Sequence, residues 1–368
     1  MTGALDGLLI ADFGRVLAGP YATMMLADLG AEVVKVERPG TGDDTRTWGP
    51  PFDEHGIATY YLAVNRNKSS EALDLRAAGD LATAKGLAAR ADVVVENFLP
   101  GAMDRLGLGY DAVRAVNPSV VYCSITGFGQ NSSMPGYDLL VQAVGGLMSM
   151  TGPAPGEPTR AGVAVVDVLT GLHATVGILA ALRHRDRTGE GQRVDVDLMS
   201  CLLSSLVNQS SGYLLAGNIP QAMGNRHPSL VPYEVFAARD KPLVIACGND
   251  GQFRSLAAVL GNEALADDAR YATNTARVNN RDELVPLLNV LLREADATDW
   301  ATRMSVVGVP AGPVNNLAEA FGYAEAQGLT AVVDCGGVTQ VANPIRLSKT
   351  PVTYRAAPPP LGGTPASA

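Results

Sequence analysis

The residues best suited to catalysis lie in two short stretches. PGYD contains Tyr137 and Asp138, and VVDVLTG, thirty residues further on, contains Asp167. An aspartate with its ordinary pKa of about 3.9 is a carboxylate at neutral pH. It needs no general base before it attacks an electrophilic carbonyl, only a fixed position beside it. Asp167 is therefore the candidate nucleophile.

A structural role competes with this hypothesis. Asp is among the favoured residues at the N-cap of a helix, and Asp167 precedes an apolar run that predicts one. Asp138 follows a Pro-Gly turn and resembles a cap in the same way. Spacing alone favours the capping role of Asp167 over catalysis, so both roles stay open.

Other catalytic chemistries find little support in the sequence. GxSxG is absent, and the four histidines lack the spacing of metal ligands, so no metal site is predicted. The four cysteines form no CxxC pair and are expected to be buried, reduced thiols: Cys123, Cys201, Cys247 and Cys335.

The opening forty residues predict a β-α-β unit but not an NAD site. A dinucleotide-binding turn needs GxGxxG, whereas Gly14, Gly19 and Pro20 have the wrong spacing. Glu37 at the end of the second strand resembles a ribose-binding acid, yet Arg38 beside it suits a phosphate better. Ligands of open α/β sheets bind beyond the carboxyl ends of strands, so phosphate or adenosine recognition is plausible there.

Strands and helices alternate over the first two hundred residues. Strand-like runs include GLLIADFG, AEVVKVE, ADVVVENF, SVVYCSIT and RVDVDLM, with helices expected near 78–90, 139–150 and 171–187. This alternation predicts an α/β fold with a parallel, doubly wound sheet covered on both faces. After about Gly224 the texture changes to a β-hairpin turning at 239–241 and further helices. The expected domains are a large domain at 1–224, a small α+β domain at 225–322 and a returning C-terminal segment at 323–368.

Composition limits the partners and the compartment. The 368 residues are 47% hydrophobic and 18% charged, which suits a sizeable core. A net charge of −9 without a basic stripe argues against nucleic acid. The N-terminus has no basic region typical of a signal peptide, and the apolar window at 161–182 contains Asp167, which disfavours a membrane span. A cytoplasmic protein without a membrane partner is expected.

Read together, a dozen collinear segments resemble the family III CoA-transferases, also called the CaiB/BaiF family. This group includes the formyl-CoA and carnitine CoA-transferases and the α-methylacyl-CoA racemases. The segments span Leu5 to about Arg355 and include GPYATMMLADLGAEVVKVERPGTGDDTR, DVVVENFLPGAMDRLGLGY, PGYDLLVQA, DVLTGLHATVGILAAL, RTGEGQRVDVDL, GNRHPSLVPYEVF and ANPIRLSKTPV.

The resemblance implies a fold and a mechanism. It implies a Rossmann-like large domain, a smaller α+β domain and a homodimer whose two subunits interlock. The substrates would be an acyl-CoA and a carboxylic acid, without a metal or NAD. Asp167 would attack the donor thioester, passing through an aspartyl anhydride and an aspartyl-CoA thioester.

The resemblance also implies CoA contacts by position. These residues follow the ends of the expected strands or the PGYD turn: Arg15, Val16, Leu17, Ala18, Arg38, Leu73, Asn97, Phe98, Arg105 and Tyr137. Oxalate-using members carry Gln where this chain has Leu17, which puts oxalate in doubt as the acceptor.

Two alternatives to CoA transfer remain. The racemases place a catalytic His where this chain has Tyr137, and a base of near-neutral pKa suits removal of an α-proton better than Tyr does. Transfer is therefore favoured over an α-methylacyl-CoA racemase or epimerase. The third hypothesis, a non-catalytic or NAD-binding protein, is disfavoured by the missing GxGxxG.

Overall fold

The computed structural model describes residues 3–363, which form two compact units. The large unit contains residues 3–148, 160–220 and 328–363, and the small unit contains residues 149–159 and 221–327. The domain bounds expected from sequence texture, 1–224, 225–322 and 323–368, remain a prediction.

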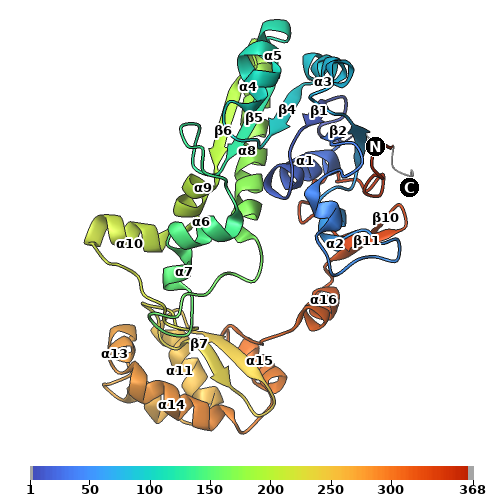
Figure 1. The fold of residues 1–368 in the computed structure, drawn as a ribbon. Helices are drawn as coiled ribbons and strands as arrows, with labels where there is room; N and C mark the ends of the chain where they lie inside the picture. The colour runs from blue at the N-terminus through green and yellow to red at the C-terminus, as the bar shows by residue number, and fades with distance from the viewer. Residues whose placement is uncertain (1–2, 364–368) are drawn as a thin grey trace. The chain divides into compact units, whose positions relative to one another are not determined.

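A six-stranded parallel sheet is the centre of the large unit, as Figure 1 shows. Its strand order is β3-β2-β1-β4-β5-β6, and every neighbouring pair is parallel. The prediction of an α/β fold with a parallel sheet is confirmed. The strands are β1 (Leu9–Asp12), β2 (Glu32–Glu37), β3 (Lys68–Ala72), β4 (Val93–Glu96), β5 (Val121–Thr126) and β6 (Arg193–Asp197).

Both faces of the four central strands, β2, β1, β4 and β5, are buried, because alternate strand residues belong to separate apolar clusters. Ile10, Val33 and Val93 pack with residues of α1 (Ala18–Asp28) and α8 (Val165–Thr188). The next residue along each strand packs on the other side, with α3 (Ala78–Arg90), α4 (Ala102–Leu106) and α5 (Tyr110–Val116). Near-continuous burial explains why these strands read as apolar runs in the sequence.

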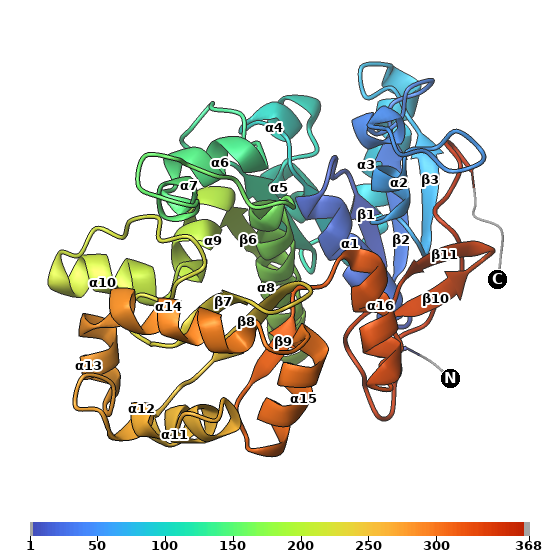
Figure 2. The same ribbon diagram turned by 90° about the horizontal axis from the view of Figure 1, so that it is seen from below.

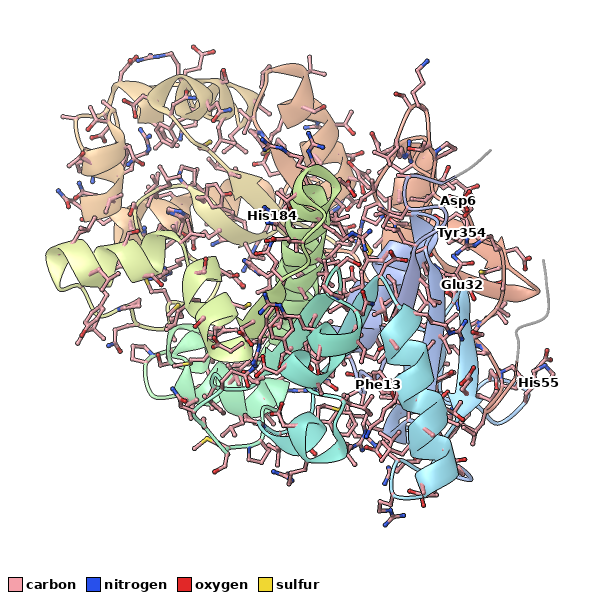
Figure 3. The ribbon with its side chains drawn as sticks, turned by 90° about the horizontal axis from the view of Figure 1, so that it is seen from above. Asp6, Phe13, Glu32, His55, His184 and Tyr354 are labelled. Carbon is pink, nitrogen blue, oxygen red and sulfur yellow. The ribbon has the colours of Figure 1, made fainter. Side chains whose placement is uncertain are left out.

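The strand order reverses between β1 and β4, and parallel sheets bind ligands beyond the carboxyl ends of the strands at such a point. Phe13 follows β1 at this edge, while Glu32 begins β2 at the opposite edge (Figure 3). The loops after β1 and β4 are joined by reciprocal hydrogen bonds. The backbone N–H of Arg15 donates to Asn97 Oδ1 at 2.8 Å, and Asn97 Nδ2 donates to the Arg15 carbonyl at 2.7 Å.

One predicted helix is two in the structure, and another begins earlier than expected. The stretch 139–150 divides into α6 (Asp138–Val144) and α7 (Leu147–Met150) at Gly146, whose φ of 85° suits glycine. Helix α8 begins at Val165, so Asp167 lies inside its first turn. The large unit also contains η1 (Asp44–Thr47), α2 (Thr59–Leu62), α9 (Leu198–Ser205), α10 (Asn208–Ala216), and the antiparallel pair β10 (Val332–Cys335) and β11 (Val338–Val341).

Among residues 3–363, α8 is the helix with the length and composition of a membrane span, with a mean hydropathy of 1.8 over eighteen residues. Its buried residues, including Val166, Ala174 and Ile178, pack against α1 and the sheet as part of the apolar core. This arrangement is that of a core helix.

The small unit is built on a three-stranded antiparallel sheet, shown with its helices in Figure 2. Strands β7 (Tyr233–Ala237) and β8 (Pro242–Ala246) form the predicted hairpin, and β9 (Ala311–Pro313) pairs with β8. Apolar side chains such as Phe236, Phe253 and Trp300 form its core. The helices are α11 (Asp250–Val259), α12 (Ala264–Asp267), α13 (Asn274–Asn279), α14 (Arg281–Leu292), α15 (Ala297–Val306) and α16 (Leu317–Ala326).

Candidate active site

The loop after β1 is held in an unusual conformation by buried charge. Val16 has a φ of 66°, a left-handed geometry that costs a β-branched residue about 1–2 kcal/mol. Its backbone N–H donates to both carboxylate oxygens of Asp43, at 3.2 and 3.3 Å. Asp43 in turn pairs with the buried Lys35, whose Nζ lies 2.9 Å away. The loop that carries Val16 is therefore fixed from beneath.

A second buried pair supports the same loop. Asp12 Oδ1 accepts from the backbone N–H of Gly14 at 2.8 Å, and Asp12 Oδ2 lies 3.1 Å from Lys68 Nζ. Lys35 Nζ also donates to the Gly14 carbonyl at 2.7 Å. Burial alone would raise the pKa of Asp12, but Lys68 and Lys35 hold this pKa below its ordinary value. The carboxylates of Asp12 and Asp43 are therefore ionised and anchor the loop.

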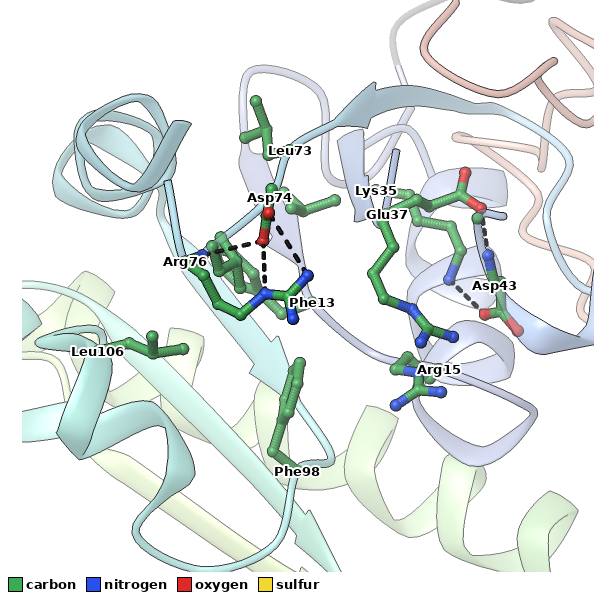
Figure 4. A pocket seen from close by; sticks show the side chains of 14 residues that line it. Phe13, Arg15, Lys35, Glu37, Asp43, Leu73, Asp74, Arg76, Phe98 and Leu106 are labelled. Atoms are coloured by element: carbon green, nitrogen blue, oxygen red, sulfur yellow. Dashed lines mark hydrogen bonds and ion pairs between the residues drawn. The ribbon is translucent and has the colours of Figure 1, made fainter. Parts of the chain in front are cut away.

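A first cavity of about 280 Å³ opens beside this loop (Figure 4). Arg15, Arg38, Leu73 and Phe98 of the predicted CoA contacts line it. Sequence reasoning missed most of the other residues of its wall, including Phe13, Arg76 and Leu106. Cationic and apolar side chains thus face one hollow, as a nucleotide phosphate and a base would require.

Glu37, considered above as a ribose-binding acid, is already occupied. Its carboxylate accepts from Arg46 Nε and Nη2 at 2.8 and 2.7 Å and from Ser70 Oγ at 2.6 Å. Burial raises the pKa of Glu37, and Arg46, Lys35 and Ser70 lower it further than burial raises it. This side chain anchors the strand end and has little capacity left for a ligand.

A second cavity, of about 420 Å³, shares Arg15 and Phe98 with the first. All of the remaining predicted site residues lie along it, namely Val16, Leu17, Ala18, Asn97, Arg105, Tyr137 and Asp167. A third cavity, of about 620 Å³, shares Val16, Leu17, Tyr137 and Asp167 with the second. The three hollows are therefore contiguous, and Asp167 lines the last two.

Apolar and aromatic side chains form most of the third cavity. Besides the shared residues, its wall contains Trp48, Tyr60, Ala63, Val64, Asp138, Leu139, Arg160, Gly162, Val163, Ala164 and Val168. Trp48 and Tyr60 meet edge to face, with ring centroids 5.8 Å apart. Sequence reasoning missed Trp48, Tyr60 and Arg160. None of the three lies in a motif or in one of the segments that resemble the family, so the sequence carried no signal for them.

The capping interpretation of Asp167 is wrong. Ala164 is the N-cap of α8, and no side chain at that position accepts a capping hydrogen bond. Asp138, from the start of α6, takes this part from outside the helix. Its Oδ1 accepts from the backbone N–H groups of Val166 and Asp167, at 2.7 and 3.2 Å. Two otherwise unsatisfied helix donors are thereby paired by a residue distant in sequence.

The Asp167 side chain is left free by this arrangement. Only 9% of the residue is exposed, and no cation pairs with its carboxylate within residues 3–363. Burial, followed by the nearby charge of Asp138, raises the pKa of Asp167 to about 7. Burial, followed by the charges of Asp167 and Asp138, raises the pKa of Tyr60 to about 12, so its phenol stays a hydrogen-bond donor. A desolvated carboxylate at a cavity junction has the setting expected of a reactive group.

Known proteins resemble this chain over nearly its full length. The model of CoA-transferase family III matches residues 5–364. The succinate–glutarate CoA-transferase of Agrobacterium fabrum is 43% identical over 97% of this chain and 93% of its own length. The acetyl-CoA:oxalate CoA-transferase of Acetobacter aceti is 41% identical over 94% of this chain and 90% of its own.

A solved structure agrees with the sequence comparisons. The crystal structure of a CaiB/BaiF family protein from Brucella suis matches with a TM-score of 0.89 and 43% identity, covering 98% of this chain and 97% of that one. Relatives named as CoA-transferases support transfer over the racemase alternative. They also set aside the hypothesis of a non-catalytic or NAD-binding protein. The chain belongs to CoA-transferase family III and is a CoA-transferase.

Proposed function

We propose that this enzyme moves CoA from an acyl-CoA to a carboxylic acid with Asp167 as its nucleophile. The observation that carries the proposal is the position of Asp167 at the junction of the second and third cavities. The adenosine phosphates would occupy the first cavity, the pantetheine arm the second, and the acyl group or acceptor acid the third. The thioester would then lie at the junction, beside Asp167.

Each step of the reaction breaks one carbon–sulfur bond and forms one carbon–oxygen bond, or the reverse. The Asp167 carboxylate attacks the donor thioester, releasing CoA thiolate and forming a mixed anhydride. The thiolate attacks the aspartyl carbonyl, which releases the donor acid and leaves an aspartyl-CoA thioester. The acceptor carboxylate repeats these steps in reverse, so the new acyl-CoA departs and Asp167 returns to a carboxylate. Covalent catalysis of this kind divides a difficult exchange into easier steps.

The CoA contacts proposed from the resemblance fit this placement. Arg15, Arg38, Leu73 and Phe98 would meet the adenosine phosphates, with charge for phosphate and apolar surface for the base. Val16, Leu17, Ala18, Asn97, Arg105 and Tyr137 would line the path of the pantetheine arm.

We propose a dicarboxylic acid as the acceptor. The names of both relatives above contain dicarboxylates, namely succinate, glutarate and oxalate. The third cavity, at about 620 Å³, lies in the range of about 300–1,000 Å³ typical of small-molecule sites and has more room than oxalate requires. An acid of four or five carbons suits it better, in keeping with the apolar Leu17.

At the level of the molecule, we propose a Rossmann-like large domain, an interlocked homodimer and a cytoplasmic location. The strand order of the sheet supports the Rossmann-like domain. Helix α10 supports the homodimer, because it exposes three apolar residues. Tyr213, Leu214 and Leu215 are 57%, 77% and 87% exposed. Exposed apolar side chains gathered on one helix are typical of an interface.

Mass spectrometry of acyl-CoA products in D₂O tests the proposed function. Purified enzyme is incubated with several donors, including succinyl-CoA and a 2-methylacyl-CoA, and with a pool of mono- and dicarboxylic acids. New acyl-CoA species that match added acids are expected, and Asp167→Ala should abolish them while CoA affinity stays similar. Deuterium uptake by the donor without exchange would instead indicate racemisation, and turnover by the Asp167→Ala variant would remove Asp167 as the nucleophile.

A further inference from the structure

Among the described residues that line the third cavity, Arg160 is the one cation. Two carboxylates, Asp138 and Asp167, line the same hollow, and the rest of its wall is apolar or uncharged. A substrate carboxylate entering this space meets two like charges at reduced solvent screening. The position of the single cation therefore decides where a second carboxylate can be held.

Three arginines of the first cavity already have acidic partners. Arg38 Nη2 lies 2.6 Å from Asp44 Oδ1, and Arg15 pairs with the other oxygen of the same carboxylate. In the first cavity, Arg76 Nε lies 3.1 Å from Asp74. Arg160, by contrast, makes no ion pair or hydrogen bond with residues 3–363. Its guanidinium retains all its donors for a ligand, in a fork that matches a carboxylate.

We propose that Arg160 determines acceptor specificity by binding the distal carboxylate of a dicarboxylic acid, while the proximal carboxylate reacts at Asp167. This inference rests on the function proposed above and adds the residue that recognises the substrate class. Leu17, Val64 and Val168 of the same wall would contact the methylene chain between the two carboxylates. A monocarboxylic acid would leave Arg160 without an anion.

The same contact acts on the donor half of the reaction. The acyl group of a dicarboxylic mono-CoA thioester carries its free carboxylate at the end remote from sulfur. Bound with its thioester beside Asp167, it directs that carboxylate into the third cavity, where Arg160 lies. One residue would therefore select dicarboxylates both as donors and as acceptors.

Acceptor kinetics test the role of Arg160. For a double-displacement enzyme, kcat/KM for the acceptor reports only the second half-reaction, whatever the donor. Glutarate is compared with pentanoate, which has the same chain length but lacks the distal carboxylate, at a fixed concentration of succinyl-CoA. Arg160→Gln should lower kcat/KM for glutarate by a factor of ~10–100, the usual effect of one charged hydrogen-bonded contact. The kcat/KM for pentanoate should change by less than about threefold, which corresponds to about 0.6 kcal/mol.

Two further variants complete the design. Arg160→Lys retains the charge and should recover part of the selectivity for glutarate. Arg187→Gln, at an exposed position in the last turn of α8, should leave both acids unaffected.

An equal fall for both acids, or no fall for glutarate, would overturn the role of Arg160. Failure of the proposed function would give a different result. If Asp167 is not the nucleophile, the Asp167→Asn variant retains turnover with either acid. The two hypotheses can therefore fail separately.

Discussion

Asp167 is a residue whose charge depends on pH within the physiological range. Only the carboxylate form can attack a thioester, and burial together with Asp138 raises the pKa of Asp167 to about 7. In the free enzyme, a large fraction of Asp167 is therefore protonated below neutral pH. Sequence reasoning assumed an ordinary aspartate, because the surroundings that shift its pKa come from other elements.

The pH dependence of the donor half-reaction should follow this titration. We expect kcat/KM for the acyl-CoA donor to rise with pH and to level off above about 7, the pKa of Asp167. Asp138→Asn removes the neighbouring negative charge but keeps an oxygen that can cap α8. This variant should move the inflection to lower pH. A profile that is flat from pH 5 to 9 would contradict the assignment of Asp167.

Ionisation of Asp167 should have the opposite effect on stability: activity rises with pH, whereas the free energy of unfolding falls. The pKa of Asp167 is raised in the folded state from 3.8 to about 7, so the folded chain binds more protons between these values. Its contribution is therefore present at low pH and is lost as pH rises through 7. Asp167→Asn should therefore raise the free energy of unfolding by about 1–3 kcal/mol more at pH 8 than at pH 5, because pH 5 lies only part of the way between the two pKa values. Thermal unfolding at both pH values measures this, and an equal effect at both would refute it.

At the scale of elements, the contact between α1 and α8 positions the site. Gly171 in α8 faces the start of α1, where an added Cβ would lie 2.8 Å from the Ala18 carbonyl oxygen and 3.0 Å from Tyr21 Cδ1. Close approach of the two helices holds Asp167 beside the loop that carries Leu17. Neither helix by itself fixes this distance.

Gly171→Ala should therefore separate α1 from α8. We expect a loss of about 1–3 kcal/mol in the free energy of unfolding, the usual effect of overpacking. The activity should also fall, because Asp167 moves relative to the second cavity. Gly86→Ala in α3 is the matched control, since nothing lies within 4 Å of its added Cβ, and it should stabilise by about 0.5–1 kcal/mol. Chemical denaturation of both variants is the measurement, and equal stability would contradict the packing argument.

The sequence predicted much at this scale. Apolar strand runs separated by helices implied parallel strands, and the carboxyl ends of parallel strands share one edge of a sheet. Placing Arg15 and Asn97 together required only this rule. The start of α8 was missed because its cap is Asp138, 28 residues away from Val166, and no local pattern reveals a cap supplied from a distance.

At the scale of the whole molecule, the exposed apolar face of α10 calls for a covering partner. Sedimentation should show a dimer of the 368-residue chain, with a second copy covering Leu214 and Leu215. Leu215→Glu places a charge in that interface and should weaken association at least tenfold, a loss of more than 1.4 kcal/mol. Val116→Glu, at another exposed apolar position, should leave the dimer intact. A stable monomer in the unsubstituted protein would exclude the homodimer.

The sequence by itself determined the parallel α/β fold, the family and the candidate nucleophile. Each depends on local patterns or on collinear motifs, which survive without coordinates. Only the tertiary structure decided that Asp138 caps α8 and shifts the pKa of Asp167, that Glu37 is occupied, and that Arg160 lies in the third cavity. These are properties of side chains brought together from separate elements, and burial and charge at such meeting points are set by three-dimensional packing.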